Sequence, residues 1–159
     1  MTSSRITRIG LISDTHGLLR PEARAALEDS DRIIHAGDIG DATILSDLAR
    51  IAPVTAIRGN NDMAPWASSL HDTETLTIGG ITIFVIHNVA DLKQMPPPAG
   101  CRVIISGHSH KPLCREENGV LFINPGSAGP RRFKLPIAVG KLRIDGGQVA
   151  AELIELSIA

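Results

Sequence analysis

Short runs of isoleucine, leucine and valine recur along this chain, and polar or turn residues follow them. Six such runs lie at 9–12, 33–34, 54–57, 83–86, 103–105 and 121–123. Runs of this length that are rich in β-branched residues are typical of buried β-strands. The pattern predicts a protein rich in sheet, with polar loops at the ends of these strands.

Two segments between the early strands follow helical spacing instead. Pro21 suits the first turn of a helix that runs through Ala26 and Leu27. Asp41 can cap a second helix, whose apolar positions follow helical spacing at Ile44, Leu45, Leu48 and Ile51. The order strand, helix, strand, helix, strand predicts a parallel sheet with right-handed crossovers.

The later part of the chain carries hairpin signals. Turn sequences stand next to further apolar runs at Gly79-Gly80, Asn118-Gly119 and Asp145-Gly146-Gly147. The α/β beginning therefore passes into antiparallel strands. We expect a single domain over residues 1–159 of the α/β class, built from two mixed β-sheets that pack face to face with helices on the outer faces.

Composition removes several classes of function. At 159 residues the chain has the size of one ordinary domain, and its net charge of −1 gives no electrostatic reason to bind nucleic acid or a membrane surface. The apolar runs are too short to span a bilayer, and Met1–Arg5 lacks the apolar region of a secretory signal. Cys101 and Cys114 form no CxxC motif and are interpreted as free thiols. We expect a cytoplasmic protein, with homo-oligomerisation left open.

The polar residues that follow the six runs include many acids and histidines. In chain order they are Asp14 and His16, Asp38, Asn60 to Asp62, His87, His108 and His110, and Asn124. Because sites in α/β sheets form at the carboxyl ends of strands, we expect these side chains to converge. Core packing explains them poorly, since each buried polar group would need its own partner.

Imidazole and carboxylate ligands together suit borderline divalent metal ions. The set is too large for one tetrahedral zinc and divides naturally between two ions that share a carboxylate. His108 and His110, two residues apart, can face one pocket whether or not they share an ion. Two ions about 3.5–4 Å apart are a recurrent clamp for in-line displacement at phosphorus, and a water between them becomes hydroxide near neutral pH. We therefore expect a hydroxide nucleophile rather than a side chain.

The motifs, taken in order, resemble those of the calcineurin-like metallophosphoesterases. They are Asp14-x-His16, Gly37-Asp38, Gly59-Asn60, His87 and Gly107-His108-x-His110. The short length, together with 124–127 and Pro130-Arg131, is similar to the small bacterial and archaeal phosphodiesterase branch. The resemblance implies a double β-sandwich flanked by helices, phosphodiesterase activity and a small phosphate-ester substrate.

The resemblance also implies a role for each ligand. Asp14, His16 and His110 would hold the first metal ion, Asp38 would bridge, and Asn60, His87 and His108 would hold the second. Manganese is the expected ion, with nickel, iron and zinc as alternatives. Asn61 and His108 are the expected catalytic residues.

Two positions depart from the family pattern. Many relatives carry histidine where this chain has Asn61, and asparagine has no proton that titrates near neutral pH. We expect Asn61 only to hydrogen-bond a phosphoryl oxygen, which favours esters with good leaving groups. Relatives often read His-Gly-His at the fourth strand end, whereas this chain has His87-Asn88-Val89, which leaves the pocket rim undefined.

Other polar and aromatic residues have less specific interpretations. We expect His35 to be a buried histidine beside the ligands that could orient a metal-bound carboxylate, and Asp62 to bond nearby backbone or a ligand histidine. Arg131 and Arg132 could grip a substrate phosphate or stand in an exposed loop. Trp66 could anchor a loop or stack on substrate.

Two other functions compete with a phosphoesterase. A protein-interaction scaffold on the same fold, as in the retromer subunit that resembles this family, would show eroded ligands and a large exposed apolar patch. A metallohydrolase acting on another bond, such as an amide, would share the metal ligands. All seven ligand positions are kept in this chain, which favours the phosphoesterase.

Overall fold

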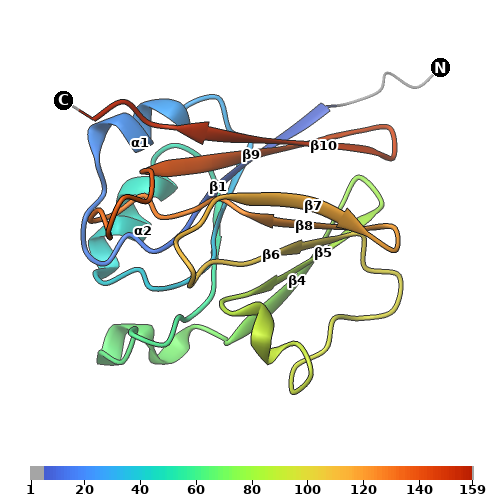
Figure 1. Ribbon diagram of the computed structural model, residues 1–159, viewed down its shortest axis with the longest axis horizontal. Helices are drawn as coiled ribbons and strands as arrows, with labels where there is room; N and C mark the ends of the chain where they lie inside the picture. Colours follow the sequence, from blue (N-terminus) through green and yellow to red (C-terminus); the bar gives the residue numbers. More distant parts are fainter. Residues whose placement is uncertain (1–5, 159) are drawn as a thin grey trace.

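A computed structural model describes residues 6–158, which form two five-stranded β-sheets (Figure 1). The first sheet has the strand order β10-β9-β1-β2-β3. Its strands are β1 (Ile6–Ile12), β2 (Arg32–His35), β3 (Val54–Ala56), β9 (Ala138–Asp145) and β10 (Gln148–Glu155). The third predicted strand is one residue shorter than its apolar run, because β3 ends at Ala56 and Ile57 already belongs to the following loop.

The second sheet has the strand order β4-β5-β6-β8-β7. Its strands are β4 (Thr73–Ile78), β5 (Ile81–Ile86), β6 (Val103–Ile105), β7 (Leu113–Glu117) and β8 (Val120–Asn124). The three hairpin signals are confirmed, because the pairs β4–β5, β7–β8 and β9–β10 are antiparallel and each joins across one of the predicted turns.

Each sheet has a parallel centre, as expected for a mixed sheet. β1, β2 and β3 run parallel in the first sheet, and β5, β6 and β8 run parallel in the second. The carboxyl ends of parallel strands lie at one edge of their sheet, and the loops that leave this edge are where sites form. The predicted architecture of two packed mixed sheets is confirmed.

The main core lies between the two sheets and follows from the alternation of side chains along each strand. Ile9 and Leu11 of β1 point into this core, where they meet Ile83 and Val85 of β5. Ile12 points to the opposite face of the first sheet. Because both faces of the central strands are buried, their sequences are apolar almost without interruption.

The two α-helices cover the outer face of the first sheet. α1 (Pro21–Ala26) and α2 (Ala42–Ala49) belong to the same apolar cluster as Ile12 and Ile33. Asp41 caps α2 by accepting a hydrogen bond from the backbone N–H of Thr43 at 2.9 Å. The helix is shorter than its apolar spacing suggested, since it ends at Ala49, before Ile51.

The outer face of the second sheet is covered differently. Within residues 6–158 no α-helix lies there; the 3₁₀ helix η2 (Val89–Asp91) and the proline-rich loop after it supply Leu92 and Met95 to a small cluster with Phe84 and Ile86. A second 3₁₀ helix, η1 (Pro65–Ser69), links β3 to β4. No helix of the described residues is long and apolar enough to cross a membrane.

Candidate metal centre

The polar residues that follow the parallel strands of both sheets meet at one place. Asp14 and His16 follow β1, Asp38 follows β2, Asn60 follows β3, His87 follows β5, and His108 and His110 follow β6. The side chains of these residues, apart from Asn60, form two groups of possible metal ligands. The predicted convergence of Asp and His side chains is therefore present in the structure.

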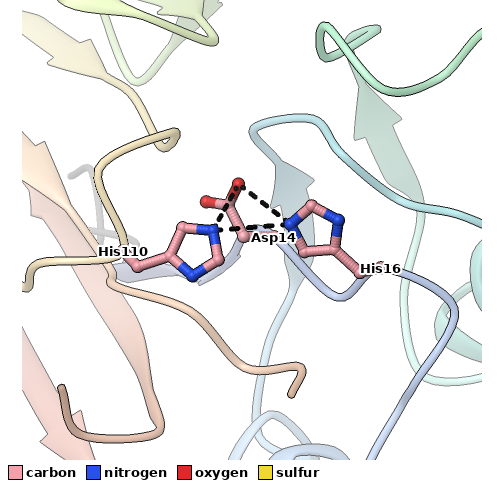
Figure 2. Close-up of side chains that lie close together, drawn as sticks. All are labelled: Asp14, His16 and His110. Atoms are coloured by element: carbon pink, nitrogen blue, oxygen red, sulfur yellow. Dashed lines mark hydrogen bonds and ion pairs between the residues drawn. The ribbon is translucent and has the colours of Figure 1, made fainter. Parts of the chain in front are cut away.

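The first group contains Asp14, His16 and His110 (Figure 2). His110 Nε2 lies 3.5 Å from Asp14 Oδ1, and His16 Nε2 lies 3.8 Å from the same oxygen. The two Nε2 atoms are 3.4 Å apart, so both rings point toward one spot next to the carboxylate. Two imidazoles and one carboxylate converging in this way are a common donor set for a divalent transition metal.

The second group contains Asp38, His87 and His108, whose ligand atoms lie within 4.8 Å of one another. His87 Nε2 lies 3.2 Å from Asp38 Oδ2. Asn60 lines the cavity that His87 and His108 also line. The two histidines of the loop after β6 therefore belong to different groups: His110 to the first and His108 to the second.

The two groups are neighbours and are connected through their carboxylates. His16 of the first group has its Nε2 3.8 Å from Asp38 Oδ2, and His87 of the second has its Nε2 3.8 Å from Asp14 Oδ1. Each aspartate therefore contacts a histidine of both groups. This arrangement is consistent with a binuclear metal site.

Buried polar atoms without partners test whether a metal ion fits these residues. Asp14 Oδ1 and His87 Nε2 are buried and accept or donate no hydrogen bond within the described structure. Leaving such atoms unpaired costs roughly 1–3 kcal/mol each. Both atoms belong to the contacts between the two groups, where a cation would satisfy them. The donor set therefore fits divalent ions.

The backbone at the ligands is held in an uncommon conformation. Seven non-glycine residues in the described part of the chain have positive φ, and five of them are candidate ligands: Asp14, His16, Asp38, His108 and His110. Such a conformation is uncommon for a residue with a Cβ and stores strain that the surrounding structure must overcome. Its concentration at one site indicates that function, rather than stability, determines the shape of these loops.

Two glycines make room for the carboxylates. A Cβ on Gly59 would collide with the backbone N and the Oδ1 of Asp38, and one on Gly107 would collide with the Ser13 hydroxyl and lie 2.7 Å from Asp14 Oδ2. Neither glycine has positive φ, so close approach is the reason for glycine at both positions.

Hydrogen bonds from neighbouring groups fix the orientation of the ligands. His87 Nδ1 donates to the carbonyl of Ala36 at 2.7 Å, which leaves Nε2 free to act as a ligand. Asp14 Oδ2 accepts from the Ser13 hydroxyl at 2.7 Å and from the backbone N–H of His108 at 3.0 Å. These bonds turn Asp14 Oδ1 toward the histidines.

Asn61 was expected to hydrogen-bond a phosphoryl oxygen, and in the structure it hydrogen-bonds Asp38. Its backbone N–H and its side-chain amide both donate to Asp38, at 2.9 and 3.1 Å. The amide N–H groups thus position the carboxylate, and donation to a phosphoryl oxygen would need the bond to Asp38 to open or the second amide hydrogen to be used. The contact of Asn61 with substrate stays a prediction.

The pKa values within the centre reflect burial and close opposite charges. Burial raises the pKa of Asp14, and the neighbouring His87 offsets this only in part. Burial also acts to raise the pKa of Asp38, but the close His87 imidazole and the hydrogen bond from the backbone N–H of Asn61 outweigh it and hold the pKa at about 2. Burial acts to lower the pKa of His87, whereas the close carboxylate of Asp38 and the contact with the Ala36 carbonyl raise it above the usual value. For His110, burial dominates and the pKa is lowered.

His35 is buried, as expected, but does not contact a carboxylate. Its Nδ1 accepts from the backbone N–H of Gly37 at 3.1 Å, and its Nε2 lies 3.0 Å from the Thr15 hydroxyl, which itself donates to the carbonyl of Ile39. With both ring nitrogens used, His35 cannot be a metal ligand. Its predicted task of orienting a carboxylate is wrong, because it braces the backbone of the two loops that carry ligands.

The burial of His35 predicts a dependence of stability on pH. Burial lowers the pKa of His35 from 6.5 to about 3. Because the unfolded chain binds a proton near pH 6.5 and the folded chain does not until about pH 3, unfolding becomes easier as the pH falls through this window. In EDTA, the wild type should lose about 1.4 kcal/mol more of its unfolding free energy between pH 7.5 and 5.5 than His35→Gln does.

Urea unfolding at several pH values measures this difference. His71→Gln, which removes a histidine whose side chain is 75% exposed, should keep the wild-type slope. Equal slopes for the wild type and His35→Gln would contradict the assignment of His35 as a buried neutral group.

The other candidates fall into structural and peripheral roles. Asp62 accepts hydrogen bonds from the backbone N–H groups of Ile39, Gly40 and Gly59. It therefore joins the loop after β2 to the loop after β3, which agrees with the expectation that Asp62 bonds nearby backbone. Trp66 packs against the cluster under the helices and so anchors its loop. Arg131 and Arg132 are exposed.

Sequence reasoning missed the role of Asn124. The Nδ2 of this buried residue donates to the carbonyl of Gly107 at 2.9 Å and to the Ser109 hydroxyl at 3.1 Å, and so holds the loop that bears His108 and His110. The signal was present, since Asn124 stands at the end of its apolar run as the other site residues do. Its partners could not be read from the sequence because they are backbone and hydroxyl groups from another strand end.

Comparison with known proteins identifies the class. Residues 7–147 match the calcineurin-like phosphoesterase superfamily domain, and the chain belongs to this family. Together with the two Asp and His groups, the family defines a metallophosphoesterase.

Individual relatives agree with this class. A probable metallophosphoesterase of Methanothermobacter thermautotrophicus is 37% identical over 157 residues, covering 92% of this chain and 91% of the relative. The phosphodiesterase MJ0936 of Methanocaldococcus jannaschii is 28% identical over 75% of this chain and 82% of its own length. Among solved structures, Vps29 of Cryptosporidium parvum matches with a TM-score of 0.77 at 20% identity, covering 96% of this chain and 99% of that one; this likeness shows the fold alone.

Proposed function

We propose that this protein hydrolyses phosphodiesters with two divalent metal ions. The observation that carries the proposal is the pair of adjacent Asp and His groups, with Asp14 Oδ1 and His87 Nε2 buried and unpaired at their junction. In this proposal Asp14, His16 and His110 hold one ion, Asn60, His87 and His108 hold the other, and Asp38 lies between them. Relatives described as a phosphodiesterase and as a probable metallophosphoesterase support the same reaction.

When bound, the ions would neutralise charge at the phosphoryl oxygens and supply hydroxide near neutral pH. The residues of the chain prepare the site for this chemistry. Asn61 holds both oxygens of Asp38, and the carbonyl of Ala36 sets the tautomer of His87. His108 remains a ligand throughout the reaction. No side chain of the site needs to become a nucleophile.

The choice of manganese as the main ion remains our proposal. Carboxylate oxygen and imidazole nitrogen accept manganese, iron, nickel and zinc, and cellular supply decides among them. The test of the proposed function is a screen of aryl phosphomonoesters, aryl phosphodiesters and an aryl amide against protein loaded with each ion, with metal content measured in parallel. Diester hydrolysis that depends on added metal supports the proposal. Equal activity in metal-free protein, or turnover of the amide alone, would overturn it.

A non-catalytic scaffold on the same fold is the second candidate. The screen separates the two functions, because a scaffold would bind metal without turning over any ester. The retained ligand set favours the enzyme, since a scaffold has no use for two strained groups of Asp and His.

Replacing Asn61 by histidine is expected to change which esters are turned over. Asparagine cannot protonate a leaving group, so alkyl esters, whose alkoxides leave poorly, should react slowly in the wild type. Asn61→His should raise kcat/KM for an alkyl methyl phosphodiester relative to an aryl one by about 10-fold or more. Asn88→His, which places an imidazole on the cavity that His87 and His108 line, is the matched control and should leave the ratio unchanged. An unaltered ratio in Asn61→His would contradict this role.

A further inference from the structure

The segment that leads from β8 to β9, orange in Figure 1, carries a turn that the proposed chemistry does not use. The backbone N–H of Leu135 donates to the carbonyl of Arg132 at 3.1 Å, and Arg131 Nη1 donates to the carbonyl of Leu135 at 3.3 Å. These two bonds close the turn and place Phe133 and Lys134 at its tip. Arg131 is therefore used within the loop, whereas Arg132 makes no such bond.

Phe133 is both exposed and strained. It is 88% exposed, and its φ is +55°, a conformation that a bulky residue rarely adopts. The other two phenylalanines contact the rest of the protein. Phe84 is buried, and the Cζ atom of Arg115 lies 5.0 Å from the centroid of the Phe122 ring. No packing within the described residues explains the position of Phe133, so its ring is free to stack on a ligand.

The surroundings of Phe133 are strongly basic. An open hollow of about 860 Å³ is lined by Ser109, Lys111, Arg132, Phe133, Lys134 and Leu135. Three of these side chains are cationic, and no acidic residue of the described chain lines the hollow. The whole chain has a net charge of −1, so this concentration of positive charge is local. Charge of one sign in a hollow attracts a ligand of the other sign.

The basic hollow adjoins the metal centre. Ser109 stands between the ligands His108 and His110, and Lys111 follows directly. A ligand that occupies the hollow can therefore extend from a phosphate at the metal centre.

The cavity beside the second group has the opposite character. It measures about 310 Å³, is lined by His87, His108 and Met95, and its one cation, Arg58, is paired with Asp72 at 2.9 Å. Asp91 also lines this cavity. An uncharged ester group suits this cavity, and an anionic group suits the basic hollow.

We propose that the basic hollow binds a nucleotide unit joined to the scissile phosphodiester. Phe133 stacks on the base, and Arg132, Lys111 and Lys134 bind a second phosphate. The inference rests on the proposed function and narrows its substrate to phosphodiesters of nucleotides. A free dinucleotide and the end of a single strand share this chemistry. Stacking on an aromatic side chain with cations along the backbone is how proteins commonly hold single strands.

Binding without cleavage tests the hollow separately from catalysis. The full-length wild type in EDTA is titrated into a fluorescein-labelled hexathymidylate at low salt, and anisotropy gives Kd. Phe133→Ala and Arg132→Gln should each raise Kd about tenfold or more. Arg132→Gln should also reduce the slope of log K against log salt concentration by about 0.7. Arg24→Gln, which removes an exposed arginine of α1, is the charge control and should leave Kd unchanged.

Cleavage with manganese then distinguishes the sources of the nucleotide. Thymidine dinucleotide with a 5′-phosphate should have a higher kcat/KM than the dinucleotide without it, and Arg132→Gln should remove this preference. Higher rates with longer oligonucleotides identify a strand end, and rates that fall with length identify the free dinucleotide.

Hydrolysis of an aryl diester without oligonucleotide binding would overturn the inference and leave the proposed function intact. Oligonucleotide binding with no ester hydrolysis would do the reverse. Wild-type affinity in both Phe133→Ala and Arg132→Gln would also overturn the inference.

Discussion

Replacing Asp38 by asparagine is expected to lower kcat/KM for an aryl phosphodiester by at least about a thousandfold, or ~4 kcal/mol. Asp38 Oδ2 lies 3.2 Å from His87 Nε2 and 3.8 Å from His16 Nε2, so its negative charge serves both ligand groups. Asparagine keeps the shape of the side chain but removes that charge and one acceptor oxygen. Metal content should fall together with activity, because the ions need an anionic ligand between them.

The matched control is Asp29→Asn. Asp29 carries the same charge but pairs with Lys141 on the surface at 2.8 Å, away from the ligand groups. This variant should keep both activity and metal content. Circular dichroism checks that Asp38→Asn is folded, and His108→Ala provides a second variant, which should lose the ion of the second group and the activity with it. Near-wild-type activity in folded, metal-loaded Asp38→Asn would falsify the assignment of Asp38.

The second large effect is expected on stability. Binding of an ion to the folded chain alone, at a concentration about a thousand times its Kd, adds ~4 kcal/mol to the unfolding free energy. For a domain of this size the corresponding rise in Tm is about 8–16 °C. The physical reason is that a bound ion gives Asp14 Oδ1 and His87 Nε2 a partner that both lack in the metal-free protein. The ion also relieves the repulsion between Asp14 and Asp38.

Thermal unfolding in EDTA and in increasing manganese measures this rise. Magnesium at the same concentration is the matched condition, and it should have a smaller effect because it binds imidazole poorly. The His87→Ala variant should show a much smaller manganese-dependent rise than the wild type. A Tm that manganese does not change would mean that the two groups hold no ion.

The parts of the fold that the sequence predicted are those with strong local signals. The hairpins at Gly79-Gly80 and Asn118-Gly119 could be recognised because turns of this kind need residues that tolerate positive φ. The apolar runs gave the parallel strands. The end of β3 before Ile57 could not be read, because Ile57 is as apolar as the strand and is fully buried in the same core.

The candidate site was visible because its donors are chemically unusual at strand ends. His110 is far from Asp14 and His16 in the chain, and only the rule that sites form at carboxyl ends of strands joined them. What the sequence left open was the set of contacts around them. Asn61 was expected to face the substrate, but its two bonds to Asp38 depend on the approach of two separate loops. The exposure and the positive φ of Phe133 have no signature in the order of residues, so the sequence does not predict them.

The positive φ angles at five of the ligands set stability and function against each other. At Asp38 or His108, glycine would adopt the same backbone without strain and would leave no donor atom in the centre. Such substitutions would relieve the backbone strain and destroy the site at the same time. The strain at the ligands is therefore a cost that the metal-free fold carries for the sake of the site, and ion binding offsets it.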